Sequence, residues 1–165
     1  MQLLIVNTIP DVSVKGADVL STDDYTIGGC TGCTDCWLKT PGVCSLNDDW
    51  EVLFKRFVKA DTIVFVTEAK LGFVSHKLKN IVDRLIPLAL PYTEMHKGAM
   101  RHKSRYKKQW GLCLVYRGDG NKAFLSEWWG RVALNVSSKS LGVCSIEESE
   151  VFCNGIGDFQ LFPKA

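Results

Sequence analysis

Four cysteines crowd into one short stretch of the chain, and their spacing is typical of metal or redox chemistry. Cys30, Cys33, Cys36 and Cys44 are separated by two, two and seven residues. Two consecutive C-x-x-C steps bring three sulfurs toward one small volume, and a Pro-Gly turn at residues 41–42 can swing the fourth thiol back toward them. We call residues 28–50 the cysteine segment and interpret its four cysteines as candidate metal ligands.

Spacing alone leaves three chemical interpretations of the cysteine segment open. Thiolates are the soft ligands that iron-sulfur clusters require, and short gaps let one loop wrap around a cluster. Four thiolates also form a closed, tetrahedral zinc site. In the third interpretation the cysteines are small apolar residues, or they form a redox disulfide. We favour a metal, because such crowding of cysteines is hard to obtain by chance.

The composition is that of a globular protein with few clues to its partners. Of the 165 residues, 46% are hydrophobic and 23% are charged, and the net charge is +2. This length predicts one domain over residues 1–165. Because no apolar run is long enough to span a bilayer and the first residues do not resemble a signal peptide, we expect a cytoplasmic protein without membrane contact. Seven cysteines in that reducing compartment argue for ligands or free thiols rather than a disulfide framework.

Strands alternate with helices along the chain, which predicts an α/β fold with a parallel sheet of the doubly wound type. The link at residues 7–16 contains Pro10 and has no helical period, so the first crossover is expected to lack its helix. Strands are predicted at residues 3–6, 17–27, 62–67, 111–116 and 141–146, and helices at 49–59, 75–85 and 124–132.

The most basic part of the chain is residues 96–108, which contain six lysines and arginines. We interpret it as a solvated loop in preference to a phosphate-binding patch. Nucleic-acid binding is not expected, because the remaining sequence is not basic and contains no recognition motif. His76, His96 and His102 are given no catalytic role.

With these elements placed, the chain resembles a known family. The run C-x-x-C-x-x-C, then P-G-V-C-S-L-N-D-D-W, K-A-D-T-I-V-F-V-T and V-S-H-K-L-K-N-I-V-D-R-L resembles the flavodoxin-like NAD(P)H-dependent FMN reductases, and among them most of all the iron-sulfur flavoproteins. The resemblance is specific over residues 27–92. It implies a five-stranded parallel sheet in flavodoxin order, FMN at the carboxyl ends of the strands, and electron transfer from NAD(P)H or a redox protein. It also places the four cysteines at the positions that hold a 4Fe-4S cluster, with zinc as the alternative.

The same resemblance implies where FMN would bind. The phosphate would lie after the first strand, and the flavin ring would lie near the ends of the third and fourth strands of the sheet. The residues at these positions are Asn7, Thr8, Thr67, Glu68, Ala69, Lys70, Arg117 and Gly118.

Both flavin loops depart from the family pattern. The family's phosphate loop leads into a helix whose free N–H groups hold the phosphate, whereas this chain has N-T-I-P-D-V-S-V-K-G, in which Asp11 would repel a phosphate. In the ring loop, Glu68 and Lys70 replace a proline and an aromatic residue. FMN therefore binds weakly, binds with help from the basic residues 101–108, or does not bind. The alternative function is a flavin-less relative that acts as a binding or assembly subunit, with a structural metal or free cysteines.

A missing first helix also has a structural consequence. The fold is expected to be a reduced flavodoxin-like sheet with its helices mainly on one face. The apolar strands at residues 3–6 and 141–146 would then be uncovered on the other face. Because an exposed apolar sheet face of that size normally marks an interface, we predict a homodimer or a partner subunit packed there.

Overall fold

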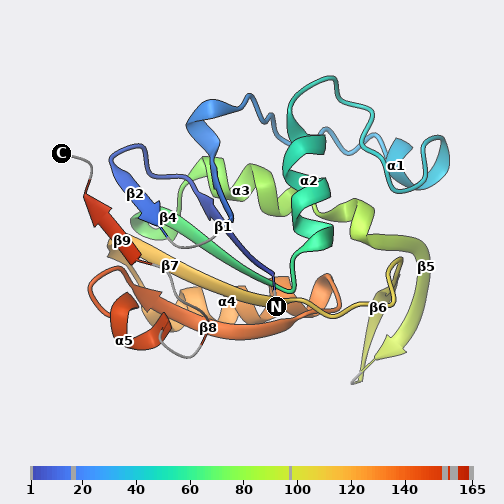
Figure 1. Cartoon of the computed structure of the whole chain (residues 1–165). Helices are drawn as coiled ribbons and strands as arrows, with labels where there is room; N and C mark the ends of the chain where they lie inside the picture. Colours follow the sequence, from blue (N-terminus) through green and yellow to red (C-terminus); the bar gives the residue numbers. More distant parts are fainter. Residues whose placement is uncertain (1, 16–17, 97, 154–155, 157–159, 164–165) are drawn as a thin grey trace.

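A computed structural model describes residues 2–15, 18–96, 98–153, 156 and 160–163. Its centre is a sheet of five parallel strands in the order β3-β1-β4-β7-β8 (Figure 1). Numbered among themselves, these strands run 2-1-3-4-5, which is the flavodoxin order. The predicted α/β, flavodoxin-like fold is therefore confirmed. The strands are β1 (Leu3–Asn7), β3 (Asp18–Ser21), β4 (Thr62–Val74), β7 (Gly111–Gly120) and β8 (Lys139–Ser145).

The three longest described helices pack on one face of this sheet, as the sequence predicted. They are α2 (Trp50–Lys59), α3 (His76–Asp83) and α4 (Lys122–Asn135). Each turns an apolar stripe toward the strands, because its buried residues recur at three- and four-residue intervals. Ser75 caps α3 by accepting a hydrogen bond from the backbone N–H of Leu78, a role that serine commonly takes at a helix N-terminus. Core residues on this face include Leu53, Phe57, Phe65, Leu78, Leu114 and Trp129.

The opposite face of the sheet is covered, so the prediction of an uncovered face is wrong. The strand β2 (Val12–Lys15) pairs antiparallel with β9 (Gln160–Pro163), and this ribbon packs on the sheet together with the short helix α5 (Ser149–Cys153). Ile5 and Val64, at the centre of that face, are 0% exposed. Short strands from the two ends of the chain replace the missing helices. The surface that was proposed as the interface is therefore covered by the chain itself. The homodimer or partner subunit stays a prediction.

Two further segments differ from the sequence prediction. The basic residues 96–108 were expected to form a loop, but β6 (Ala99–Ser104) pairs antiparallel with β5 (Ala89–His96) in a projecting hairpin (Figure 1). Lys97 lies outside the described residues. Residues 68–73 were also expected to form a loop, but they belong to β4 and pair with β7 as far as Gly120. The remaining described elements are η1 (Thr22–Asp24), α1 (Asp35–Leu38) and η2 (Ile86–Leu88).

Two other observations bear on function. Cys113 and Cys144 are buried in β7 and β8, as expected of core residues. In the described part of the chain, no helix is long and apolar enough to cross a membrane.

Candidate functional site

The four cysteines of the cysteine segment line one small cavity. This cavity measures about 50 Å³, and Trp37, Leu46 and Ile86 are among its other walls. The chain enters α1 through Thr34 in the left-handed conformation. It turns back at Gly42, whose φ is +87° and whose N–H donates to the carbonyl of Cys36 at 2.8 Å. The predicted Pro-Gly turn thus returns Cys44 to the other cysteines.

The sulfurs surround this cavity without forming a finished metal site. Within the described ranges, no group of three or more His, Cys, Asp or Glu side chains is arranged to hold a metal ion. Cys30 and Cys33 are exposed, Cys44 is half-buried and Cys36 is buried. The segment therefore combines two accessible thiols with two that lie against the body of the protein.

The environments of Cys33 and Cys36 shift their thiol pKa values in opposite directions. Burial raises the pKa of Cys36, and the neighbouring Cys44, Cys30 and Cys33 add to this because their negative charges would disfavour another thiolate. The pKa of Cys33 is lowered by a hydrogen bond from the backbone N–H of Asp35 and by contacts with the hydroxyls of Ser45 and Thr31. Cys33 is thus the readier of the two to act as a thiolate ligand.

The cysteine segment is attached to the helical layer by one buried cation. Arg84 follows α3 and is only 2% exposed. Its Nη1 donates to a carboxylate oxygen of Asp48 and, at 3.3 Å, to the carbonyl of Gly28. Its Nη2 donates to Sγ of Cys44 at 3.2 Å. The guanidinium also lies 5.0 Å from the centre of the Trp50 ring, a cation–π contact.

Asp48 connects the two ends of the cysteine segment. Its carboxylate accepts hydrogen bonds from the N–H of Gly28 at 2.9 Å and from the N–H of Trp50 at 3.1 Å. Burial by itself would raise the pKa of Asp48, but the hydrogen bonds from Arg84, Gly28 and Trp50 hold it below its ordinary value. Arg84 and Asp48 therefore join the beginning and the end of the cysteine segment.

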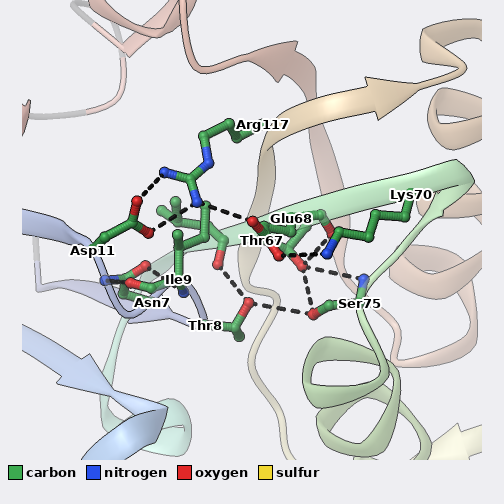
Figure 2. Close-up of polar contacts among 10 residues, drawn as sticks. Asn7, Thr8, Ile9, Asp11, Thr67, Glu68, Lys70, Ser75 and Arg117 are labelled. Carbon is green, nitrogen blue, oxygen red and sulfur yellow. Dashed lines mark hydrogen bonds and ion pairs between the residues drawn. The ribbon is translucent and has the colours of Figure 1, made fainter. Parts of the chain in front are cut away.

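A second polar cluster lies at the carboxyl end of β1 and on the neighbouring residues of β4 and β7, where the flavin residues were predicted (Figure 2). We call this region the carboxyl edge. The Asn7 amide donates to the carbonyls of Ile9 and Val12, at 3.0 and 2.8 Å, and its oxygen accepts from the N–H of Ile9 at 3.1 Å. The Thr8 hydroxyl donates to the carbonyl of Val66 at 3.0 Å. Both predicted phosphate ligands are thus occupied in shaping the short link after β1.

The residues predicted to lie beside the flavin ring are paired with each other as well. The hydroxyls of Thr67 and Ser75 are 2.9 Å apart. Ala69 is buried and lies opposite Gly118 in the β4–β7 ladder. At Gly118, with a φ of +97°, a Cβ atom would come within 2.8 Å of the Ala69 carbonyl oxygen, so this close approach requires glycine. Strand pairing therefore continues where the family would place two separate loops.

Arg117 is the centre of the ion pairs at this edge (Figure 2). It donates to both carboxylate oxygens of Asp11, at 2.8 and 2.9 Å, and to Glu68 at 3.0 Å. Lys70 lies 3.6 Å from the other oxygen of Glu68. The hydrogen bond from Arg117 lowers the pKa of Glu68, and the bonds to Asp11 and then Glu68 raise the pKa of Arg117. Two carboxylates therefore balance two cations, which leaves no net positive charge for a phosphate.

The structure brings together most of what the sequence singled out, in two places rather than one. The four cysteines share a cavity, and Asn7, Thr8, Thr67, Glu68 and Arg117 meet at the carboxyl edge. Sequence reasoning missed both ion-pair centres. Arg84 could have been recognised from its position, because it follows the buried Ile81 by three residues and therefore continues the buried side of α3.

Comparison with known proteins agrees with this architecture. No protein-family model matches the chain. An iron-sulfur flavoprotein of Methanocaldococcus jannaschii is 29% identical over 97 residues, which are 58% of this chain and 49% of the relative. An iron-sulfur flavoprotein of Archaeoglobus fulgidus is 38% identical over 68 residues, 41% of this chain and 32% of the relative. The chain has a flavodoxin-like fold and is similar in sequence to these two iron-sulfur flavoproteins. It spans half or less of the length of these two relatives.

Two solved structures share the fold at low sequence identity. RosB, crystallised with 8-demethyl-8-formylriboflavin-5′-phosphate, superposes with a TM-score of 0.53 at 15% identity and covers 88% of this chain and 64% of its own. A flavone reductase superposes with a TM-score of 0.52 at 15% identity, covering 93% and 59%. At this identity the likeness shows the fold alone.

Replacing Arg84 by Met should destabilise the protein by about 3 kcal/mol at neutral pH, because Asp48, whose side chain is 11% exposed, would be left partly buried without its cation. Lys79→Met, which removes an exposed ion pair with Asp83, is the control and should cost less than about 0.5 kcal/mol. The pKa of Asp48 is below its ordinary value of 3.8. The stabilisation is therefore present above about pH 4 and is lost as pH falls through the folded pKa. Urea unfolding at pH 7 and pH 3 measures both effects, and equal losses for the two variants at pH 7 would contradict the role of Arg84.

Proposed function

We propose that this chain is an electron-transfer protein of the iron-sulfur flavoprotein type, in which Cys30, Cys33, Cys36 and Cys44 hold an iron-sulfur cluster. One observation carries the proposal: the four cysteines line a single cavity in a chain related to proteins named iron-sulfur flavoproteins. The donor set suits the group, since such clusters are held by four cysteine thiolates. A bound cluster would supply one-electron transfer.

The residues around the cysteines support this role in two ways. Arg84 donates a hydrogen bond to the sulfur of Cys44, and hydrogen bonds to ligand sulfurs tune the reduction potential of a cluster. Trp37, Leu46 and Ile86 give the cavity an apolar wall that excludes water. A cavity of about 50 Å³ is smaller than a cubane cluster, so Cys30 and Cys33, which are exposed, would move outward while Cys36 and Cys44 stay anchored.

Anaerobic reconstitution with iron and sulfide should give about four iron and four sulfide per chain, with a broad visible absorption. Cys33→Ser and Cys36→Ser should each abolish the absorption, because each removes a ligand. Cys113→Ser is the matched control, since Cys113 lies in the core strand β7 and should leave the iron content unchanged. One zinc per chain, with no retained iron, would instead support the structural-metal alternative, and no retained metal of either kind would reject both.

The carboxyl edge gives less support for FMN binding than the cysteine segment gives for a cluster. The described residues there do not fit a bound phosphate, because Asn7 and Thr8 are engaged with the backbone and Arg117 is engaged with two carboxylates. We propose that Asp11 keeps this edge closed to FMN, so that NAD(P)H-dependent flavin chemistry is not an activity of the closed form. The ion pairs of Arg117 with Asp11 and Glu68 therefore favour the alternative function, that of a flavin-less relative.

Asp11→Asn should raise FMN affinity about tenfold, equivalent to about 1.4 kcal/mol, because it removes a negative charge and releases the Arg117 fork for the phosphate. Glu51→Gln, an exposed change on α2, should leave the affinity unchanged. Flavin fluorescence titration at low salt measures the affinity. If Asp11→Asn binds FMN no better than the unchanged protein, Asp11 does not control flavin access.

A further inference from the structure

A second and larger cavity lies on the helical side of the molecule, away from the carboxyl edge. Its volume is about 670 Å³, within the range of small-molecule sites. Its walls come from α3, from the C-terminal half of α4, from the β5–β6 hairpin and from the cysteine segment. No residue of β1 or β4 is among its described walls. It is therefore separate from the predicted flavin position.

The walls of this cavity suit a flat aromatic molecule. Trp37 of the cysteine segment and His102 of β6 pack against each other, with ring centres 4.7 Å apart and planes tilted by 40°. Together with Trp128 of α4 they form aromatic walls of the cavity. The Trp37 ring is held in place by its Nε1, which donates to the carbonyl of Ile86 at 3.2 Å. Val82 and Val132 supply aliphatic surface. Aromatic and apolar walls of this kind favour stacking of a planar ring.

The charges around the cavity favour an anion. Lys79 and Asp83 neutralise each other, since Lys79 Nζ lies 2.6 Å from the Asp83 carboxylate. The Nη1 of Arg101 donates to the amide oxygen of Asn135 at 2.6 Å. In the described part of the chain, no carboxylate pairs with Arg101. One positive charge without a carboxylate partner therefore remains at the cavity wall, where it favours an anion.

The cavity also adjoins the cysteines. Cys30, Gly32, Trp37 and Ile86 line both this cavity and the small one enclosed by the four cysteines. A molecule bound here is consequently next to Cys30.

We propose that this cavity binds a planar aromatic molecule that carries a sulfonate or carboxylate group, with its rings against Trp37, His102 and Trp128 and the anion at Arg101. The proposal goes beyond the proposed cluster and does not depend on it, because binding uses only side chains of the chain itself.

Anthraquinone-2-sulfonate is a suitable probe, and 2-(hydroxymethyl)anthraquinone is its neutral analogue. With the chain of residues 1–165, to which no iron has been added, titration calorimetry should give saturable binding of one sulfonate per chain. The neutral analogue should bind about tenfold more weakly, because it lacks the charge that pairs with Arg101. Tryptophan fluorescence should be quenched in parallel.

Arg101→Gln should weaken sulfonate binding about tenfold and leave binding of the neutral analogue unchanged. Lys103→Gln is the matched control, because Lys103 is an exposed residue of the same strand and is not a wall of the cavity. Absence of saturable binding, or equal binding of the two probes to the unchanged protein, would overturn the proposal. Because no iron is present, either result is distinguishable from failure of the proposed cluster.

Discussion

The geometry of the cysteine segment depends on the buried guanidinium of Arg84. A cation that is 2% exposed is tolerated only when it is paired and hydrogen-bonded. Here the acceptors of its two Nη groups are Asp48, the Gly28 carbonyl and the sulfur of Cys44, while its Nε is buried without a partner in the described part of the chain. These acceptors lie at the beginning, near the end and among the cysteines of the segment. One side chain after α3 thus fixes a loop that has little regular structure of its own.

A consequence is that the four candidate ligand cysteines lie outside the layer formed by α2, α3 and α4, and away from the carboxyl ends of the strands. With Cys36 and Cys44 anchored and Cys30 and Cys33 exposed, the segment is open on its outer side. The larger cavity adjoins it through Cys30 and Trp37. The β5–β6 hairpin lies against the segment, since Trp37 and His102 are in contact, and it completes the larger cavity with Met100 and Arg101.

Whereas the cysteine segment is open on its outer side, the carboxyl edge is closed by the short link after β1. Without a helix there are no free helical N–H groups to bind an anion, and the Asn7 side chain instead bonds to the link itself. Asp11 then reaches Arg117, which also pairs with Glu68 (Figure 2). The same compact link that helps to cover the sheet with β2 and β9 therefore occupies the groups that a phosphate would need.

The sheet and the helical layer could be predicted because their signals are local. Apolar runs such as residues 62–67 and the three- and four-residue periodicity of α2 and α3 depend only on neighbouring residues. The convergence of the four cysteines was also predictable, since the C-x-x-C spacing and the Pro-Gly turn bring them toward one volume, although Arg84 then holds the segment in place. What could not be predicted rests on contacts between distant residues. Examples are the pairing of Val12 with Pro163 and the bonds of Arg84 to residues of the cysteine segment. The β5–β6 hairpin was missed because its charged residues and Pro91 resemble a loop.

The most direct measurement of the central claim is iron X-ray absorption on the anaerobically reconstituted protein. If the four cysteines hold a cluster, the iron should be bound by sulfur alone, with a second shell of neighbouring iron atoms. Iron bound by oxygen or nitrogen, or iron without an iron neighbour, would contradict the account and remove the basis for electron transfer through the cysteine segment.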